Sequence, residues 1–407
     1  MRLDRRRLLS ILGGIVAVLA ALYGTIAWHT SNRIGNEALR ASYDHGPPKC
    51  DDAVVETVSD SAVTLRPVAD DSSRVGRGPV WGIRWREGWG EVGSLRDNFG
   101  KGITRSFSAG EGNLKPGTAV DLTVELVRSD PLRACRLAFE NVLIDAPLGA
   151  QPAWHVPGMS DTWAIFVHGK GADRTQALST LSLYAGRGLA GSGLPCLVIT
   201  YRNDRGGPQS PDGRYHYGRT EWEDLEAACK FALAQGASRF ILVGFSMGGG
   251  IVLNFLERSS LAPKVRGAVL DAPVVDFGAT VDLGIRLARL PFLGTPLPPL
   301  AGALGKGLAS VRFGVDWDDY DFLRNANRIN APLLVFHGEE DDVVPIEGSV
   351  ALYGARLNLV TLERFEGARH LESWNLGRAR YESAVAGLLK SALRPPRRLG
   401  HYTPRSP

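Results

Sequence analysis

Short apolar runs alternate with helix-like segments from about residue 136 to 393. Each run is long enough for one buried strand: WAIFV (163–167), LPCLVITY (194–201), RFILVGF (239–245), VRGAVLD (265–271), PLLVFHG (332–338) and VTLERF (360–365). Between them, EWEDLEAACKFALAQG (221–236) has a helical pattern that closes on a glycine. Continuous apolar strands separated by helices are typical of a parallel sheet covered on both faces. The pattern therefore predicts an α/β fold, and residues 139–158 predict a hairpin as an antiparallel start to its sheet.

Alternation with a period of two marks residues 51–135. Stretches such as AVVETV (53–58), AVTLRPV (62–68), VWGIRWR (80–86) and VDLTVELV (120–127) are separated by turn residues. This pattern predicts a β-rich accessory module over 51–135. Trp81, Ile83 and Trp85 are expected on the buried face of its sheet, the alternative being a surface for membrane or substrate contact.

The stretch LLSILGGIVAVLAALYGTIAW (8–28) carries no charge over its 21 residues. As a helix it would extend roughly 31 Å, which is enough to cross a bilayer core. Four arginines precede it in residues 1–7, and the positive-inside rule places that end in the cytoplasm. We therefore predict a cytoplasmic N-terminus (1–7), a single-pass transmembrane anchor (8–28), a stalk (29–50) and an extracytoplasmic catalytic domain at the cell membrane. A cleaved signal peptide is the alternative.

The alternation of strand and helix is interrupted between residues 276 and 317. This segment is rich in leucine, proline and glycine and is too long for a simple connection. Its leucine content favours a lid with an apolar underside, and a peripheral helical excursion is the alternative. At the other end, RPPRRLGHYTPRSP (394–407) predicts a disordered tail.

The charge and the cysteines of the chain bear on nucleic-acid binding and on disulfide formation. The net charge of +4 comes from arginines at the two ends of the chain, so the middle is close to neutral and no nucleic-acid partner is expected. In an exported chain, Cys50 and Cys135 are candidates for a disulfide. Cys196 and Cys229 lie on apolar elements and are expected as buried thiols. The cysteine spacing matches no zinc site.

GFSMGGG (244–250) contains the pattern Gly-x-Ser-x-Gly, which a glycine-rich chain also produces by chance. Here it follows a strand pattern and precedes the helix pattern IVLNFLERS. A serine at such a junction has its hydroxyl presented at the sheet edge by a strained turn, and the flanking glycines make room for that turn. A purely structural glycine crossing needs no serine at its apex, so Ser246 is the candidate nucleophile.

A serine nucleophile needs a base and an acid that orients the base. Of the eight histidines, only His370 and His401 follow the last clear strands, and His401 lies in the predicted tail. His370 is therefore the candidate base. The candidate acids lie in HGEEDDVVP (337–345), which leaves a predicted strand with four consecutive carboxylates.

The serine turn, the His-Gly-x-x-Asp-x-x-Val-Pro segment and the closing histidine stand in the order that makes residues 136–393 resemble an α/β-hydrolase. The resemblance implies Asp341 as the acid, with Asp342 as the alternative because adjacent carboxylates leave the register open. It also implies an oxyanion hole from the backbone N–H groups of Lys170, in VHGKG (167–171), and Met247. His168 matches a histidine that is usually structural in this family.

The resemblance implies acyl transfer to water in two steps, without a cofactor or a metal. Arg202 and Asn203 leave a strand at the catalytic edge and are candidates for substrate binding, or for a plain turn. The predicted anchor, lid and neutral body favour a carboxylic ester with an acyl or lipid-like chain.

Two alternatives to an ester hydrolase stay open, because this fold supports many reactions. One is an exported serine peptidase that resembles the proline iminopeptidase group. The other is a non-catalytic binding or scaffold protein on a hydrolase fold. The sequence does not specify an oligomeric state.

Overall fold

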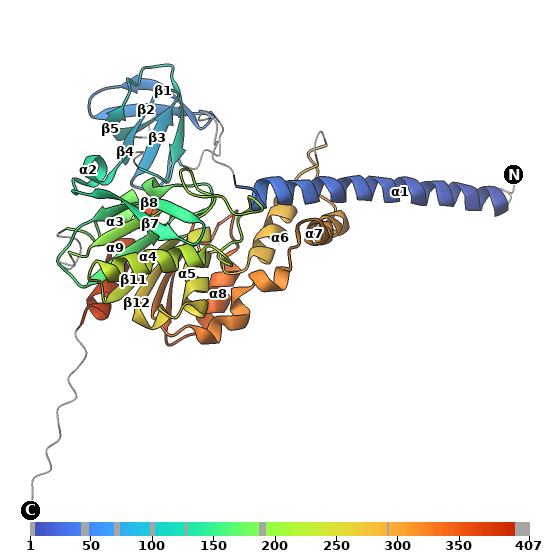
Figure 1. Cartoon of the computed structure of the whole chain (residues 1–407). Coiled ribbons are helices and arrows are strands. Elements are labelled where there is room, and N and C mark those ends of the chain that lie inside the picture. The colour runs from blue at the N-terminus through green and yellow to red at the C-terminus, as the bar shows by residue number, and fades with distance from the viewer. Residues whose placement is uncertain are drawn as a thin grey trace, which may run out of the picture.

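The computed structural model describes residues 5–41, 49–68, 74–97, 102–126, 129–186, 193–290 and 293–394. An N-terminal helix, a small β-barrel and a larger sheet domain follow one another along the chain (Figure 1). Residues 1–4 of the predicted cytoplasmic end and residues 395–407 of the predicted tail lie outside the described residues.

An eight-stranded sheet forms the centre of the larger domain, in the order β14-β13-β12-β11-β9-β10-β8-β7. Strands β9 to β14 are parallel, whereas β8 is antiparallel to both β7 and β10. The strands are β7 (Glu140–Ala146), β8 (Gly149–Val156), β9 (Thr162–Val167), β10 (Cys196–Ile199), β11 (Arg239–Phe245), β12 (Val265–Asp271), β13 (Leu333–Gly338) and β14 (Val360–Phe365). The predicted parallel sheet with an antiparallel hairpin at its start is confirmed.

Helices cover both faces of this sheet because its strands are apolar on both sides. One core packs under α4 (Trp222–Ala234), α5 (Met247–Arg258) and α8 (Ile346–Ala355). The other core packs under α3 (Leu178–Leu181) and α9 (Ser373–Ala392). Short 3₁₀ helices fill the connections: η2 (Arg174–Ala177), η4 (Ala262–Lys264), η5 (Trp317–Tyr320) and η6 (Phe322–Arg328).

The β-rich module is a closed antiparallel barrel with the strand order β1-β2-β5-β4-β3-β6. Its strands are β1 (Ala53–Val58), β2 (Ala62–Pro67), β3 (Trp81–Trp85), β4 (Gly88–Asp97), β5 (Ile103–Glu111) and β6 (Ala119–Thr123). Trp81, Ile83 and Trp85 lie in its interior, with exposed fractions of 0%, 1% and 3%. The predicted buried stripe is therefore confirmed, and closure removes the free sheet edges that a small β module would otherwise expose.

The candidate disulfide between Cys50 and Cys135 is not formed, since both are free thiols. Cys50 lies beside the barrel residue Asp121. Cys135 ends the short helix α2 (Pro131–Cys135), and its Sγ donates to the Leu178 carbonyl of α3 at 3.3 Å. The two thiols are thus held by different parts of the molecule. Cys196 and Cys229 are buried free thiols, as predicted.

The barrel is fixed to the sheet domain at the start of α9. Arg74 Nε donates to Oε1 of the buried Glu372 at 2.8 Å. Asn375 Nδ2 donates to the carbonyls of Val80 and Val124 at 3.1 and 3.3 Å. Glu372 follows His370 by two residues, so the barrel contacts the segment that carries the candidate base.

The N-terminal helix α1 (Arg5–Arg33) continues directly into the π-helix η1 (Ile34–Leu39). The predicted stalk is therefore wrong over residues 29–39, where Ser31, Ile34 and Leu39 are buried against the sheet domain. The polar residues of this stretch predicted an exposed spacer, but its few apolar residues pack against the sheet domain. Residues 42–48 of the predicted stalk lie outside the described residues.

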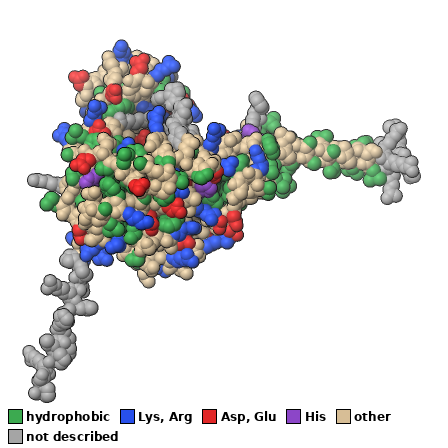
Figure 2. All heavy atoms as spheres, in the orientation of Figure 1, with side chains coloured by type: hydrophobic (Ala, Val, Ile, Leu, Met, Phe, Trp, Pro, Cys, Tyr) green, Lys and Arg blue, Asp and Glu red, His purple; other side chains and the backbone are tan. Residues whose placement is uncertain are grey.

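The earlier part of α1 projects away from the body with apolar side chains along it (Figures 1 and 2). This helix is long and apolar enough to cross a membrane, and only 6% of its most apolar window is buried. A signal sequence near an N-terminus has the same properties.

The excursion predicted at residues 276–317 consists mainly of α6 (Phe277–Leu287) and α7 (Pro299–Phe313). Both helices lie beside the base of α1 in Figure 1. Contact between α1 and α7 is close: a Cβ added to Gly305 would lie 2.5 Å from Thr30 Cβ, and one added to Gly35 would lie 2.2 Å from the Phe313 ring. Glycine at both positions therefore permits this packing.

Candidate active site

Ser246 lies between β11 and α5, at the carboxyl edge of the parallel strands. Its backbone has φ 52° and ψ −117°, a conformation that L-residues adopt rarely. The turn is held by a bond from Ser246 N to the Asp271 carbonyl at 2.8 Å and by one from Val274 N to the Ser246 carbonyl at 3.1 Å. A Cβ at Gly248 would come within 2.2 Å of the Val167 carbonyl. The glycine-rich sequence is thus required for the close packing that holds the serine at the sheet edge.

His370 connects the serine to a carboxylate on a third loop. His370 Nε2 lies 2.9 Å from Ser246 Oγ, and His370 Nδ1 lies 2.8 Å from Asp341 Oδ2. The loops after β11, β13 and β14 each supply one of these side chains. The structure therefore brings together the three residues predicted as nucleophile, acid and base, over 124 and 29 positions of sequence separation.

Asp341 is the carboxylate that faces the imidazole, whereas Asp342 is exposed. Asp341 Oδ1 accepts hydrogen bonds from the backbone N–H groups of Val343 and Val344 at 2.9 and 2.8 Å. Burial alone would raise the pKa of Asp341, but hydrogen bonds from His337 and His370 hold it well below its ordinary value. These contacts therefore favour the ionised form of Asp341 beside the imidazole.

His337 is a neighbour of Asp341 for which sequence reasoning found no role. It is completely buried, and its Nε2 lies 3.3 Å from Asp341 Oδ2. The same nitrogen lies 3.0 Å from the Val344 carbonyl, and Nδ1 lies 2.8 Å from Ser349 Oγ. The His-Gly pair that opens HGEEDDVVP is the signal that could have revealed it, because a histidine at the end of a buried strand needs polar partners.

Asp271 is a second carboxyl group near the imidazole. It ends β12 and is 3% exposed. Burial raises its pKa to about 7, although a hydrogen bond with Tyr381 and the nearby His370 and His337 act in the opposite direction. No sequence motif marked this aspartate, which stands at the end of an ordinary apolar strand pattern.

The predicted oxyanion donors lie on either side of the serine turn. Met247 is the first residue of α5, so its N–H belongs to the first helical turn, which has no intrahelical acceptor. On the other side, a Cβ at Gly169 would lie 3.1 Å from Ser246 Cβ, which brings the loop of Lys170 against the serine. Gln176 Oε1 accepts from Gly169 N at 2.7 Å and fixes this loop. Sequence reasoning missed Gln176, since a lone glutamine on a helical turn carries no pattern.

The side chain of Lys170 reaches the N-terminal helical segment. Its Nζ donates to the Glu37 carbonyl of η1 at 2.6 Å. Burial lowers the Lys170 pKa, although the Glu37 carboxylate acts against this shift. The ammonium group therefore joins the N-terminal helix to the loop beside Ser246.

His168 is a buried structural residue in this arrangement. Its Nε2 lies 2.9 Å from Asp204 Oδ2, its Nδ1 lies 2.9 Å from the Gly169 carbonyl, and its ring stacks on Tyr201 at 4.6 Å. Burial alone would lower the His168 pKa, but the Asp204 carboxylate more than offsets this and raises it. The pair ties the loop before Lys170 to the end of β10.

Arg202 and Asn203, the candidates for substrate binding or for a plain turn, are turned into the protein and have internal partners. Arg202 is 5% exposed and donates to Asp224 at 2.8 Å and to Glu223 at 2.9 Å. Asn203 is fully buried, with its Nδ2 donating to the Arg214 carbonyl and its Oδ1 accepting from Ser210 N. The charged Arg202 at the end of a strand suggested a substrate-binding site. The carboxylates that pair with it belong to α4, which begins about 20 residues later in the sequence.

Comparison with known proteins places this geometry in a family. The model of the alpha/beta hydrolase family matches residues 155–384. The chain belongs to the α/β-hydrolase family. The serine turn, the loop after β13 and the loop after β14 all lie within the matched residues.

Two individual proteins show a distant similarity to this chain. A candidate non-heme chloroperoxidase of Synechocystis sp. is 26% identical in an alignment of 213 residues that covers 44% of this chain and 75% of that protein. The Pyrococcus furiosus esterase Pf2001 aligns with a TM-score of 0.50 at 20% identity, over 65% of this chain and 96% of that one. At this identity the solved structure shows that the fold is shared and nothing finer.

Proposed function

We propose that this α/β-hydrolase is a serine hydrolase of carboxylic esters, with Ser246 as nucleophile, His370 as general base and Asp341 as the acid that orients the base. The observation that supports this proposal is the continuous hydrogen-bonded series from Asp341 through His370 to Ser246. The ionised Asp341 fixes the tautomer of His370 that leaves Nε2 free to accept the serine proton.

In the first step, Ser246 Oγ attacks the ester carbonyl while His370 Nε2 takes its proton. The N–H groups of Lys170 and Met247 stabilise the tetrahedral oxyanion, and loss of one such donor typically costs about 10² to 10³ in rate. His370 then gives the proton to the departing alcohol, which leaves an acyl-enzyme. In the second step, His370 activates water, which releases the acid and restores Ser246.

Labelling with a fluorophosphonate probe tests the nucleophile. The wild type is expected to be labelled, and Ser246→Ala is expected to remain unlabelled although folded. Asp341→Asn should lower kcat by about 10⁴-fold, because the amide favours the wrong imidazole tautomer. Asp342→Asn is the matched control, and its turnover should stay within about twofold of wild type because an exposed carboxylate has no contact with the imidazole.

The outcomes separate the three functional hypotheses. An unlabelled, well-folded wild type would favour the scaffold protein. Labelling together with turnover of 4-nitrophenyl esters, and none of aminoacyl anilides, supports the esterase. The reverse preference would support a serine peptidase instead.

We further propose that α1 is an uncleaved single-pass anchor of the cell membrane, with the sheet domain on the extracytoplasmic side, and that the α6–α7 segment acts as a lid. The apolar, projecting surface of α1 supports the first part. The position of α6 and α7 beside the base of α1 supports the second, because it puts both helices near the bilayer.

A further inference from the structure

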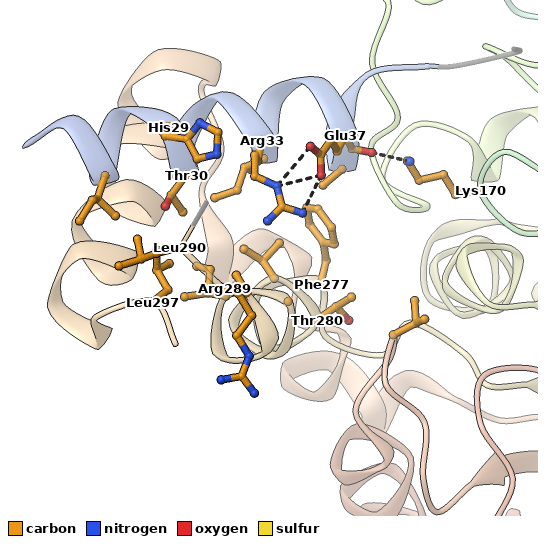
Figure 3. A pocket seen from close by; sticks show the side chains of 18 of the residues that line it. His29, Thr30, Arg33, Glu37, Lys170, Phe277, Thr280, Arg289, Leu290 and Leu297 are labelled. Atoms are coloured by element: carbon orange, nitrogen blue, oxygen red, sulfur yellow. Dashed lines mark hydrogen bonds and ion pairs between the residues drawn. The ribbon is translucent and has the colours of Figure 1, made fainter. Parts of the chain in front are cut away.

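An apolar cavity of about 510 Å³ lies between the base of α1 and the α6–α7 segment. Its size is within the range of roughly 300–1,000 Å³ that is usual for small-molecule sites. Ile26 of α1 and Ile34 of η1 form one wall, and Val281 and Ile285 of α6 form the opposite wall. In Figure 3, Arg33 of α1 and Glu37 of η1 lie across from Phe277 and Thr280. Leu290 and Leu297 lie toward the end farther from Lys170.

One end of this cavity adjoins the loops that carry the candidate catalytic residues. Lys170 lines the cavity and directly follows Gly169, where an added Cβ would lie 3.1 Å from Ser246 Cβ. Val343 also lines it, and its N–H donates to Asp341 Oδ1 at 2.9 Å. A chain held in the cavity would therefore have its inner end beside the serine turn.

The α1 wall is rigidly docked, so the cavity is a built feature of the fold. Arg312 of α7 donates to Ser31 Oγ at 2.9 Å and stacks over the Trp28 ring at 4.0 Å. Since Gly305 contacts Thr30 and Phe313 contacts Gly35, α7 runs in the same direction as α1. The six residues from Gly305 back to Pro299 extend α7 roughly 9 Å further, alongside the last turns of the apolar stretch.

The part of the α6–α7 segment that lies alongside the apolar stretch of α1 exposes large apolar side chains. The exposed fractions are 53% for Leu287, 71% for Leu293, 62% for Leu300 and 49% for Leu304. Exposed leucines beside an apolar projecting helix are typical of a surface that enters a bilayer. The cavity thus lies between a membrane-facing surface and the serine turn.

We propose that this cavity binds the acyl chain of a membrane-resident ester, which reaches it directly from the bilayer, and that the base of α1 is a wall of the substrate site. The inference rests on the proposed function for its chemistry and assigns that function a lipid substrate. It makes the helix a part of substrate recognition as well as an anchor.

Gly284 allows the cavity to be filled without disturbing the fold. It lines the cavity, and a Cβ added to it meets no atom within 4 Å. Gly284→Phe therefore adds a ring at the lining of the cavity, and replacing a glycine inside α6 does not weaken the helix. Gly307→Phe is the matched control, because Gly307 of α7 has equally open space and is exposed, but does not line the cavity.

The full-length chain in phosphatidylcholine nanodiscs is assayed with 4-nitrophenyl butyrate and 4-nitrophenyl palmitate. Gly284→Phe should lower kcat/KM for the palmitate by about tenfold or more, since displacing even two buried methylene groups has that effect. Gly284→Phe should hydrolyse the butyrate ester at the wild-type rate. Gly307→Phe should hydrolyse both esters at the wild-type rate. An equal loss on both esters, or no change on either, would overturn the acyl-chain site.

A phosphatidylcholine with a photoreactive diazirine in its acyl chain tests binding without catalysis. Cross-links are expected on α1 and α6 in wild type and Gly307→Phe, and not in Gly284→Phe. If wild type is cross-linked there but cleaves neither ester, the lipid site stands and the hydrolase proposal fails. If the esters are cleaved but the cross-links are absent or unchanged in Gly284→Phe, the hydrolase stands and the lipid site fails.

Discussion

At the scale of single residues, Asp271 links the serine turn to the pH dependence of stability. Its backbone carbonyl holds Ser246 N, while its buried carboxyl group has a pKa raised from 3.8 to about 7. Between these two values the folded protein keeps a proton that the unfolded chain releases. The stabilisation of the folded state by the protonated Asp271 is therefore fully present below about pH 4 and is lost as the pH rises through about 7.

Asp271→Asn should remove this dependence, because the amide does not titrate. The free energy of unfolding of wild type minus that of the variant should fall as pH rises from 4 to 8, by at most about 4 kcal/mol at about 1.4 kcal/mol per pKa unit. Denaturant unfolding of the detergent-solubilised proteins, followed by tryptophan fluorescence at constant ionic strength, measures it. The contribution of Asp341 to the free energy of unfolding is common to both proteins and cancels in this difference. Its lowered pKa changes stability with the opposite sign, at lower pH. A difference that does not vary with pH would show that Asp271 is ionised normally.

At the scale of structural elements, the barrel supports the loop that carries His370. Glu372 receives Arg74 Nε on one oxygen and the Arg369 N–H, at 3.1 Å, on the other. Leu371, between the histidine and this glutamate, has φ 60°. A β-barrel contact thus helps to hold a backbone conformation next to the candidate base that a leucine adopts rarely.

Arg74→Ala should therefore lower kcat by roughly tenfold with KM little changed, because a displaced imidazole weakens proton transfer and leaves the substrate cavity intact. Arg74→Lys should recover part of the loss by restoring a positive charge near Glu372. Arg66→Ala is the control on the same barrel, since its ion pair with Glu56 is exposed and contributes little. A change confined to KM, or an equal effect of Arg66→Ala, would show that the barrel has no role in positioning His370.

Elements with a continuous local pattern were predictable, and contacts between distant elements were not. Strands β11, β12 and β14 begin and end where their apolar runs do. The serine, histidine and aspartate could be selected because a known family order relates them. The internal role of Arg202 depends on Asp224, and the docking of Ile34 depends on α7, so neither follows from local sequence. Barrel closure likewise depends on strands β1 and β6, whose paired residues Ala53 and Val120 are 67 positions apart.

At the scale of the whole molecule, the N-terminal helix and the catalytic domain form one packed unit. Ala27 and Ile34, from the last turns of α1 and the start of η1, are buried against α7 and its neighbours, with exposed fractions of 6% and 5%. Removal of α1 near residue 28, as a signal peptidase would do, would break the contacts of Ala27 and Trp28 with α7. The packing therefore favours an anchor that is retained.

Orientation follows from the charges before the apolar stretch, which favour a cytoplasmic N-terminus. In membranes from cells that express a doubly tagged chain, protease should remove a C-terminal tag from right-side-out vesicles and an N-terminal tag only from inverted ones. Both tags should be present on the same mature polypeptide. Loss of the N-terminal tag during maturation would identify α1 as a signal peptide, and a C-terminal tag accessible only in inverted vesicles would reverse the topology. Cleavage of α1 would also require a different route for a bilayer lipid to reach the cavity, whereas a reversed topology would only exchange the leaflet that supplies the lipid.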